Sequence, residues 1–191
     1  MARVKAVLVP VKAFHDSKLR LAPVLAQPGR AALARELAAR VILAASPFPV
    51  SVVCDDHDVA AFAESLGAAV IWTPGRGLSG AVEEGVARLA DTGARVVVVA
   101  HADLPRVSSF GRIGDAGSRS PSVTIVPDRR RDGTNVIAVP VGMGFRFSYG
   151  PGSFGRHLTE AVRLGLECEV VEDDDLAADV DVPSDLELLA R

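Results

Sequence analysis

Three aspartates are the residues best suited to hold a metal ion. Asp103 stands in the segment HADLP (residues 101–105), which follows a run of four valines and one alanine. Asp179 and Asp181 are separated by one residue, so in an extended chain both carboxylates point to the same side. Brought near Asp103, this pair would form a three-carboxylate site suited to one or two Mg²⁺ ions. The simpler interpretation is that Asp103 caps a following helix.

A basic segment follows the first predicted strand. It contains Lys12, Lys18 and Arg20, and a triphosphate needs several such charges to offset its own. A solvated loop with scattered basic residues is the alternative interpretation. The segment has neither a Walker sequence nor a GxGxxG pattern, so the sequence indicates neither a P-loop enzyme nor a dinucleotide dehydrogenase.

A third group of candidate residues precedes a predicted helix in the C-terminal third. Gly150, Gly152 and Ser153 lead into this helix, and free backbone N–H groups at a helix N-terminus bind phosphate. A serine that caps the helix after a tight turn explains Ser153 equally well. The spacing leaves open whether Arg156 and His157 face a ligand or solvent. No serine or cysteine is accompanied by a recognisable base, so covalent catalysis is not supported.

Short valine-rich runs alternate with helical stretches along the chain. Runs of strand length occupy residues 7–11, 50–54, 68–72, 95–100, 123–126, 136–139 and 169–171. Helical patterns occupy about residues 28–45, 58–66, 78–90, 154–164 and 183–189. This order predicts an α/β fold, with a mostly parallel sheet covered by helices on both faces. Such sheets bind ligands beyond the carboxyl ends of their strands, where the candidate segments stand.

Length and composition favour one domain over residues 1–191. The chain is 49% hydrophobic and has no linker-like tract, which suits a single core. Its net charge of −3 gives no electrostatic case for binding nucleic acid. No apolar run approaches the roughly 20 residues that cross a bilayer, and the N-terminus lacks signal-peptide features. We therefore expect a cytoplasmic protein without a membrane partner, whose oligomeric state the sequence does not indicate.

Taken together, these segments resemble the 2-phospho-L-lactate guanylyltransferase family, including its phosphoenolpyruvate-using members, which act in making the deazaflavin coenzyme F(420). The resemblance spans almost the whole chain. The segments that carry it are VPVK (9–12), KLRL (18–21), ADLP (102–105), DGTN (132–135), YGPGSF (149–154), RH (156–157) and DVDVP (179–183). The GPGSF segment is the most specific, whereas ADLP and DVDxP are shared with the wider nucleotidyltransferase superfamily. One departure is Ser79, near which the family pattern has Asn.

The resemblance implies a single Rossmann-like nucleotidyltransferase domain and three groups of site residues. The implied magnesium ligands are Asp103, Asp179 and Asp181. The implied contacts to a small phosphorylated three-carbon acid are Thr134, Gly150 and Ser153. The residues implied to lie along the GTP phosphates are Lys12, Lys18 and Arg20.

The implied reaction transfers GMP from GTP to the acid and releases pyrophosphate. Phosphoenolpyruvate is favoured over 2-phospho-L-lactate, because the Ala- and Arg-rich composition is typical of actinobacteria, whose family members tend to use it. Three other interpretations stay open. The chain is a nucleotidyltransferase for a molybdopterin or sugar phosphate, a non-catalytic nucleotide-binding protein, or an unrelated phosphate-binding Rossmann-like domain. Intact Asp103, Asp179 and Asp181 argue against the non-catalytic protein.

Overall fold

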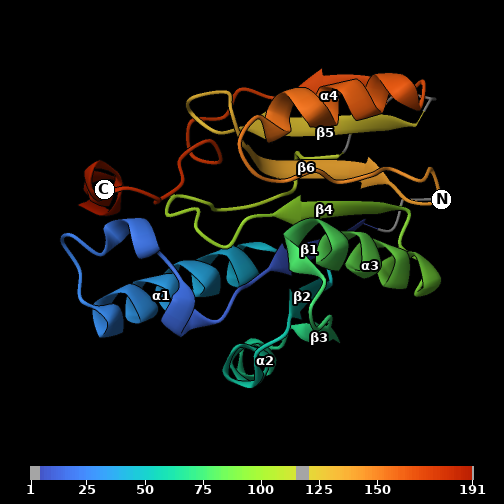
Figure 1. The fold of residues 1–191 in the computed structure, drawn as a ribbon. Coiled ribbons are helices and arrows are strands. Elements are labelled where there is room, and N and C mark those ends of the chain that lie inside the picture. The colour runs from blue at the N-terminus through green and yellow to red at the C-terminus, as the bar shows by residue number, and fades with distance from the viewer. Residues whose placement is uncertain (1–4, 115–120, 191) are drawn as a thin grey trace.

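The computed structural model describes residues 5–114 and 121–190, and in this part of the chain seven strands form one sheet (Figure 1). The strand order is β3-β2-β1-β4-β6-β5-β7. The strands are β1 (Lys5–Pro10), β2 (Val50–Cys54), β3 (Ala69–Trp72), β4 (Val96–Ala100), β5 (Ser122–Pro127), β6 (Thr134–Pro140) and β7 (Glu167–Val170). Strand β6 runs antiparallel to β4 and β5, and the other neighbouring pairs are parallel. The predicted mostly parallel α/β sheet is confirmed.

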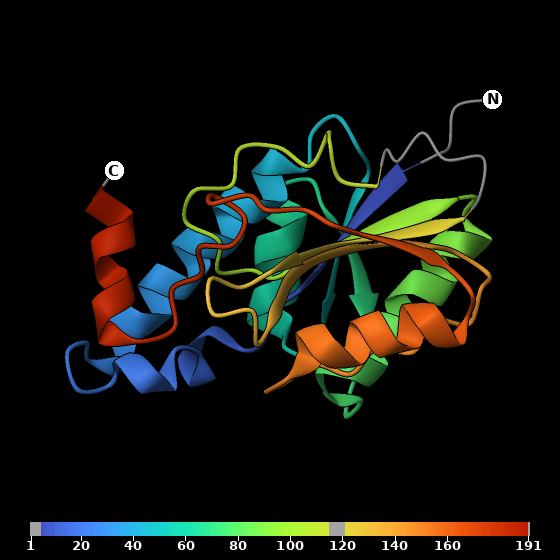
Figure 2. The same cartoon turned by 90° about the horizontal axis from the view of Figure 1, so that it is seen from above.

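Helices cover both faces of this sheet (Figure 2). The helices are α1 (Gln27–Ala44), α2 (His57–Ser65), α3 (Gly77–Asp91) and α4 (Ser153–Arg163). Residues of α1 and α2 share one hydrophobic cluster with the sheet, and residues of α3 and α4 share a second cluster with it. The strands supply both clusters because successive side chains point to opposite faces.

Strand β4 shows why the valine run stands in the middle of the sheet. Val96 and Val98 pack in the cluster with α1 and α2, and Val97 and Val99 pack in the cluster with α3 and α4. All four side chains are buried, as expected for a strand covered on both faces. The run therefore carries the segment after Ala100 to the edge where β1, β2 and β3 also end.

Three local expectations need correction. The strand predicted at 169–171 is β7 at Glu167–Val170, because it pairs in register with β5 at the edge of the sheet. The final helix predicted at 183–189 is a 3₁₀ helix, Pro183–Ala190. The segment after β1, expected to be a loop, contains two short 3₁₀ turns at Phe14–Asp16 and Leu19–Leu21. In each case long-range packing, which local pattern does not contain, decides the geometry.

No helix in the described residues combines the length and hydrophobicity that crossing a bilayer requires. The cytoplasmic location stays a prediction.

Helix α3 packs closely against the sheet at Gly85. A Cβ atom at this position would lie 2.7 Å from Cδ2 of Leu8 and 2.8 Å from Cγ1 of Val53. Both neighbours are buried core side chains, so neither has free space to move into. The glycine thus sets the distance between α3 and β1.

We expect Gly85→Ala to lower the free energy of unfolding by about 1–3 kcal/mol, because the added methyl group overpacks the core. Gly80→Ala is the matched control, since its Cβ would meet its nearest atom, Cβ of Arg76, only at 3.5 Å. The control should gain up to about 1 kcal/mol from the better helix propensity of Ala. Urea denaturation measures both variants, and equal stabilisation of both would contradict the close packing.

Candidate active site

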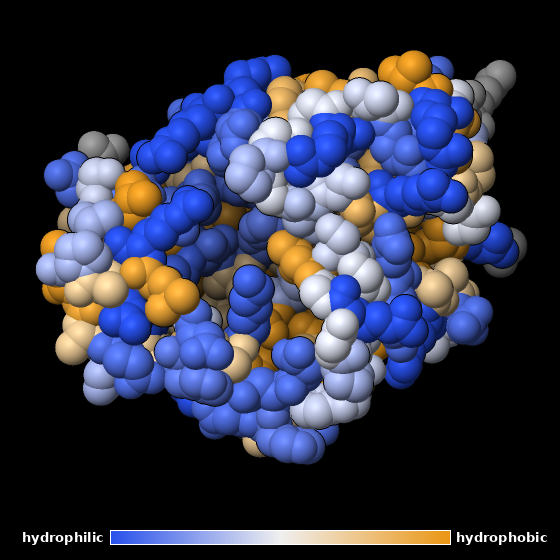
Figure 3. Space-filling view, in the orientation of Figure 1, coloured by the Kyte–Doolittle hydropathy of each residue, from blue (hydrophilic) through white to orange (hydrophobic). Residues whose placement is uncertain are grey.

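A cleft of about 450 Å³ opens at the carboxyl ends of β1, β2, β3 and β4. Its walls come from residues 10–12, 53–55 and 101–103, each at the end of a strand, and from the start of α3. Figure 3 shows the molecule hollowed on the face that carries α3, with apolar atoms inside the hollow and polar residues around it. The cleft lies where parallel α/β sheets bind their ligands.

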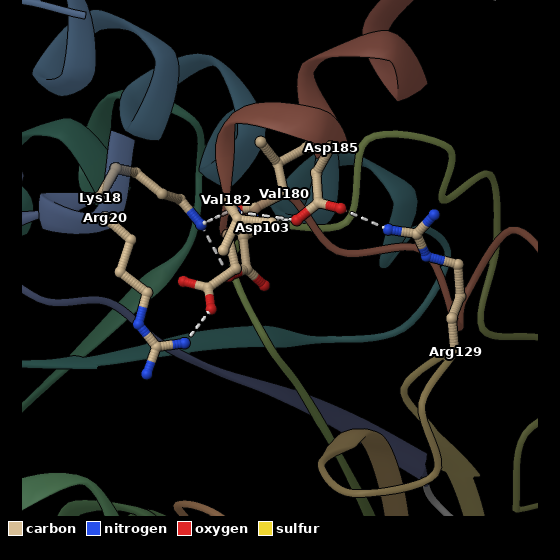
Figure 4. Close-up of polar contacts among 8 residues, drawn as sticks. Lys18, Arg20, Asp103, Arg129, Val180, Val182 and Asp185 are labelled. Carbon is tan, nitrogen blue, oxygen red and sulfur yellow. Dashed lines mark hydrogen bonds and ion pairs between the residues drawn. The ribbon is translucent and has the colours of Figure 1, made fainter. Parts of the chain in front are cut away.

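An ion pair between Lys18 and Asp103 occupies one end of the cleft (Figure 4). The Lys18 ammonium donates to Oδ2 of Asp103 at 2.7 Å and to the carbonyl oxygen of Val180 at 2.6 Å. Its side chain is only 10% exposed. Lys18 also has a left-handed backbone (φ 56°, ψ 38°), which residues other than glycine rarely adopt and which is enriched at functional sites. The loop thus holds this cation in one defined position.

The second carboxylate oxygen of Asp103 has no hydrogen-bond partner among the described residues, although it is buried. Burial is the largest single influence on Asp103 and opposes its ionisation, but the charge and hydrogen bond of Lys18, together with smaller contributions, hold the pKa of the carboxyl below its usual value. Asp103 is therefore an anion with one oxygen available. A bound cation would satisfy that oxygen.

Asp181 also lines the cleft, and its carboxylate accepts a hydrogen bond from Nη1 of Arg20 at 2.5 Å. The Arg20 side chain is 67% exposed and that of Asp181 is 40% exposed, so this pair contributes little to stability and is free to exchange partners. The N–H of Val180 donates to the carbonyl oxygen of Asp103 at 3.1 Å. This bond places the segment 179–181 beside β4.

Asp185, which the sequence analysis missed, shapes the backbone next to Asp181 (Figure 4). One of its oxygens accepts from the N–H groups of Asp181 and Val182, each at 2.9 Å. The other oxygen accepts from Nη2 of Arg129 at 2.6 Å, and Asp185 is only 5% exposed. Asn135 anchors the same segment upstream by donating to the carbonyls of residues 176 and 177. These contacts hold the acidic segment against the sheet.

Asp179 is the one predicted metal ligand that is not among the residues lining the cleft, although it lies near enough to Asp103 to feel its charge. Burial, and then the negative charge of Asp103, raise its pKa to about 6. No three His, Cys, Asp or Glu side chains of the described segments are already arranged around a common point. Asp103 and Asp181 are the carboxylates that fit a hard cation, since Mg²⁺ commonly takes one or two protein carboxylates plus phosphate oxygens.

Lys12 and His101 are two further polar residues that line the cleft. Lys12 is exposed there and makes no hydrogen bond or ion pair within the described residues, so its charge is available to a ligand. His101 also lines the cleft, and its Nε2 is buried without a partner in the same part of the chain. Burial lowers the pKa of His101, so the ring is neutral at physiological pH. The spacing of His101 in the sequence matches no metal-ligand pattern and so predicts no metal role for it.

Thr134, Gly150 and Ser153 gather around the start of α4 but do not line the cleft. The Thr134 hydroxyl lies 3.0 Å from Nδ1 of the buried His157. The N–H of Ser153 donates to the carbonyl of Gly150, whose φ of 106° requires glycine. The structure thus brings these three residues together, in a group separate from the charged end of the cleft.

Tyr149 lies between this group and the cleft. Its ring centroid is 5.1 Å from that of His157 and 5.2 Å from that of His101, which lines the cleft. Its N–H donates to Oγ of Ser79 in α3 at 3.0 Å, so the residue that departs from the family pattern serves as an anchor for the loop. Arg156, whose direction the spacing left open, donates to carbonyls of residues 148–151 and stabilises the loop itself.

The fold is that of known nucleotidyltransferases. A nucleotidyl transferase from Methanothermobacter is similar with a TM-score of 0.67 and 15% identity, over 98% of this chain and 96% of that chain. The CMP:2-keto-3-deoxy-manno-octonic acid synthetase complexed with CTP is similar with a TM-score of 0.61 and 14% identity, over 97% of this chain and 96% of that chain. This chain therefore shares its fold with these two nucleotide-using enzymes, and the cleft lies at the carboxyl edge of that fold.

The sequence comparisons identify the family. The model described as "Guanylyl transferase CofC like" matches residues 5–190. The phosphoenolpyruvate guanylyltransferase of Rubrobacter xylanophilus is 38% identical over 184 residues, which are 94% of this chain and 90% of that protein. The protein of the same name from Chloroflexus aggregans is 33% identical over 187 residues, 92% of this chain and 91% of that protein. This chain belongs to the guanylyl transferase CofC-like family and is a nucleotidyltransferase.

The family resemblance inferred from the sequence is thus confirmed. The comparisons do not favour the three alternatives, which were an enzyme for a molybdopterin or sugar phosphate, a non-catalytic nucleotide-binding protein and an unrelated phosphate-binding Rossmann-like domain. The roles of the individual site residues stay predictions.

His157 gives the site a testable pH dependence. Its Nε2 accepts a hydrogen bond from the N–H of Ser148 at 3.1 Å, so the ring is neutral and Nδ1–H donates to Thr134. Burial, and then the positive charge of Arg156, lower the pKa of His157 to about 4 from the usual 6.5. Between pH 6.5 and pH 4 the unfolded chain therefore binds a proton at His157, and the folded protein does not. The resulting stability is present above pH 6.5 and is lost as the pH falls toward 4.

Between pH 7 and pH 5 the unfolding free energy should drop by about 2 kcal/mol through His157 alone. We expect His157→Gln to remove this part of the pH dependence. His15→Gln, which changes an exposed histidine, should keep the pH profile of the unaltered protein. Denaturant titrations at several pH values measure the effect, and parallel profiles for all three proteins would contradict the buried neutral ring.

Proposed function

We propose that this enzyme transfers GMP from GTP to phosphoenolpyruvate, with Mg²⁺ and release of pyrophosphate, as a step in the biosynthesis of coenzyme F(420). One observation carries the proposal: cations and carboxylates lie paired in a cleft at the carboxyl edge of the sheet, in a chain of the guanylyl transferase family. The name of the relatives, phosphoenolpyruvate guanylyltransferase, supports the choice of acceptor.

The basic residues would bind the triphosphate. Lys12, Lys18 and Arg20 all line the charged end of the cleft. Lys18 and Arg20 pair with Asp103 and Asp181, so cation and carboxylate already lie in contact. The β- and γ-phosphates would accept from these side chains, which stabilise the charge that grows on the leaving pyrophosphate.

Asp103 and Asp181 would hold the Mg²⁺ ion. The unpartnered oxygen of Asp103 and the exposed carboxylate of Asp181 supply the hard oxygen ligands, and phosphate oxygens would complete the shell. When bound, the ion would neutralise charge on the phosphates and act as a Lewis acid at the transferred group. Asp179 lies outside the cleft lining, and because its pKa is raised only to about 6 it is mostly ionised at neutral pH and would be available as a third carboxylate.

The reaction needs little acid–base chemistry from the protein. An oxygen of the acceptor phosphate attacks the α-phosphorus of GTP, the bond from that phosphorus to the bridging oxygen breaks, and pyrophosphate leaves. A phosphate monoester is already anionic near neutral pH, with a second pKa of about 6, so no general base is required. The site must instead align two anions and offset their repulsion.

We place the acceptor beside the start of α4. Thr134, Gly150 and Ser153 stand at the N-terminus of α4, where the helix dipole favours an anion, while the N–H groups of Ser153 and Phe154 already donate to backbone carbonyls. Tyr149 and His101 separate this group from the charged end of the cleft, so the acid would reach the nucleotide past these two rings.

A pyrophosphate-release assay tests the proposal by crossing GTP, ATP and CTP with phosphoenolpyruvate, 2-phospho-L-lactate and 3-phosphoglycerate. We expect GTP with phosphoenolpyruvate to give the highest kcat/KM, by at least about tenfold, since contacts to polar groups discriminate strongly. Reactions that lack either the acid or Mg²⁺ should release no pyrophosphate. A preference for ATP or CTP would contradict the nucleotide, and a preference for another acid would contradict the acceptor.

A further inference from the structure

The cleft has a second end, and its residues differ in kind from those around Lys18 and Asp103. This end, which we call the base end, is lined by Val53, Cys54, Asp55, Thr73, Leu78 and Ala81. Four of the six side chains are apolar or nearly so and suit the faces of a flat ring. The polar groups among them are the Asp55 carboxylate and the Thr73 hydroxyl.

The two ends are spaced to suit a nucleotide. Strand β2, which carries Asp55, is separated from β4, which carries Asp103, by β1 alone. Neighbouring strands lie about 4.8 Å apart, so their ends are about 10 Å apart, comparable with the length of a nucleoside. A nucleotide whose triphosphate lay near Lys18 would therefore be long enough for its base to reach Asp55 and Thr73.

Asp55 has no structural partner. It makes no hydrogen bond or ion pair with any described residue. The neighbouring Asp56 already caps α2, since its side chain accepts from the N–H of Val59 at 3.0 Å. Asp55 is thus an exposed carboxylate at the cleft wall that the fold itself does not use.

Thr73 adds an independent observation. It follows β3 as Asp55 follows β2, and its N–H donates to the carbonyl of Cys54 at 3.0 Å, so the two residues lie at adjacent strand ends. Thr73 is only 3% exposed, and its hydroxyl has no partner within the described residues. Buried polar groups without partners are uncommon, and a bound ligand would supply one here.

We infer that the base end reads guanine, with Asp55 as the residue that determines nucleotide specificity. This inference rests on the proposed use of GTP. A carboxylate only accepts hydrogen bonds, and guanine presents two adjacent donors, N1–H and the 2-amino group. Adenine and cytosine present a ring acceptor at the corresponding position, which the carboxylate repels. The Thr73 hydroxyl donates to the O6 carbonyl beside them.

The test compares kcat/KM for GTP, ITP and XTP. Inosine lacks the 2-amino group, and xanthosine replaces it with a carbonyl. The unaltered enzyme should prefer GTP to both by at least about tenfold, because each loses one hydrogen bond to a charged group. The amide of Asp55→Asn presents one acceptor and one donor, which match N1–H and the 2-carbonyl of xanthine. The ratio of kcat/KM for XTP to kcat/KM for GTP should therefore rise by at least about tenfold in this variant.

Asp58→Asn is the matched control, because it removes the same charge on α2 outside the cleft lining and should leave the nucleotide preference unchanged. Thr73→Val should lower kcat/KM for GTP and ITP by the same factor, since both bases keep O6. An unchanged XTP-to-GTP ratio in Asp55→Asn, in a protein that still selects GTP, would overturn the inference. An unaltered enzyme that selects ATP or CTP would instead overturn the proposed function.

Discussion

The ion pair of Lys18 with Asp103 is the interaction on which the site depends. It joins the basic loop after β1 to the end of β4, and the same ammonium binds the carbonyl of Val180 near the C-terminus. Three segments far apart in the sequence therefore meet at one nitrogen. Removing one charge would leave the other poorly solvated and unpaired, which is costly in a site this enclosed. The left-handed backbone of Lys18 indicates that the loop is shaped for this contact.

The rest of the cleft follows from this arrangement. Asp185 and Arg129 hold the acidic segment where its carboxylate faces Arg20, and the sheet spaces the charged end from the base end. His157 orders Thr134 and the loop before α4 at the same time. The cations in the cleft would bind the phosphates, and the order of the strands would set the distance from those phosphates to a bound base.

Much of this organisation is contained in local sequence pattern. Valine-rich runs that alternate with helical stretches predict a parallel sheet. The position of Asp103 after one of these buried runs predicts that ligands bind at the carboxyl edge of that sheet. The pattern does not predict Asp185, His101 or Asp55, because their roles depend on which way a side chain points after segments more than 40 residues apart meet. The same limit applies to Asp179. Its spacing from Asp181 is that of a metal-ligand pair, but local spacing does not predict that Asp179 lies outside the cleft lining.

Calorimetric titration of GTP, with and without Mg²⁺, tests most directly whether the Lys18–Asp103 pair marks the triphosphate site. Mg²⁺ should strengthen GTP binding to the unaltered enzyme, and Asp103→Asn should abolish that strengthening. Lys18→Ala should weaken GTP binding by about tenfold or more at either Mg²⁺ level, through loss of a charge-assisted contact. Glu36→Gln, at an exposed pair on α1, should bind GTP as the unaltered enzyme does. Undiminished, Mg²⁺-dependent binding in both Lys18→Ala and Asp103→Asn would contradict the account.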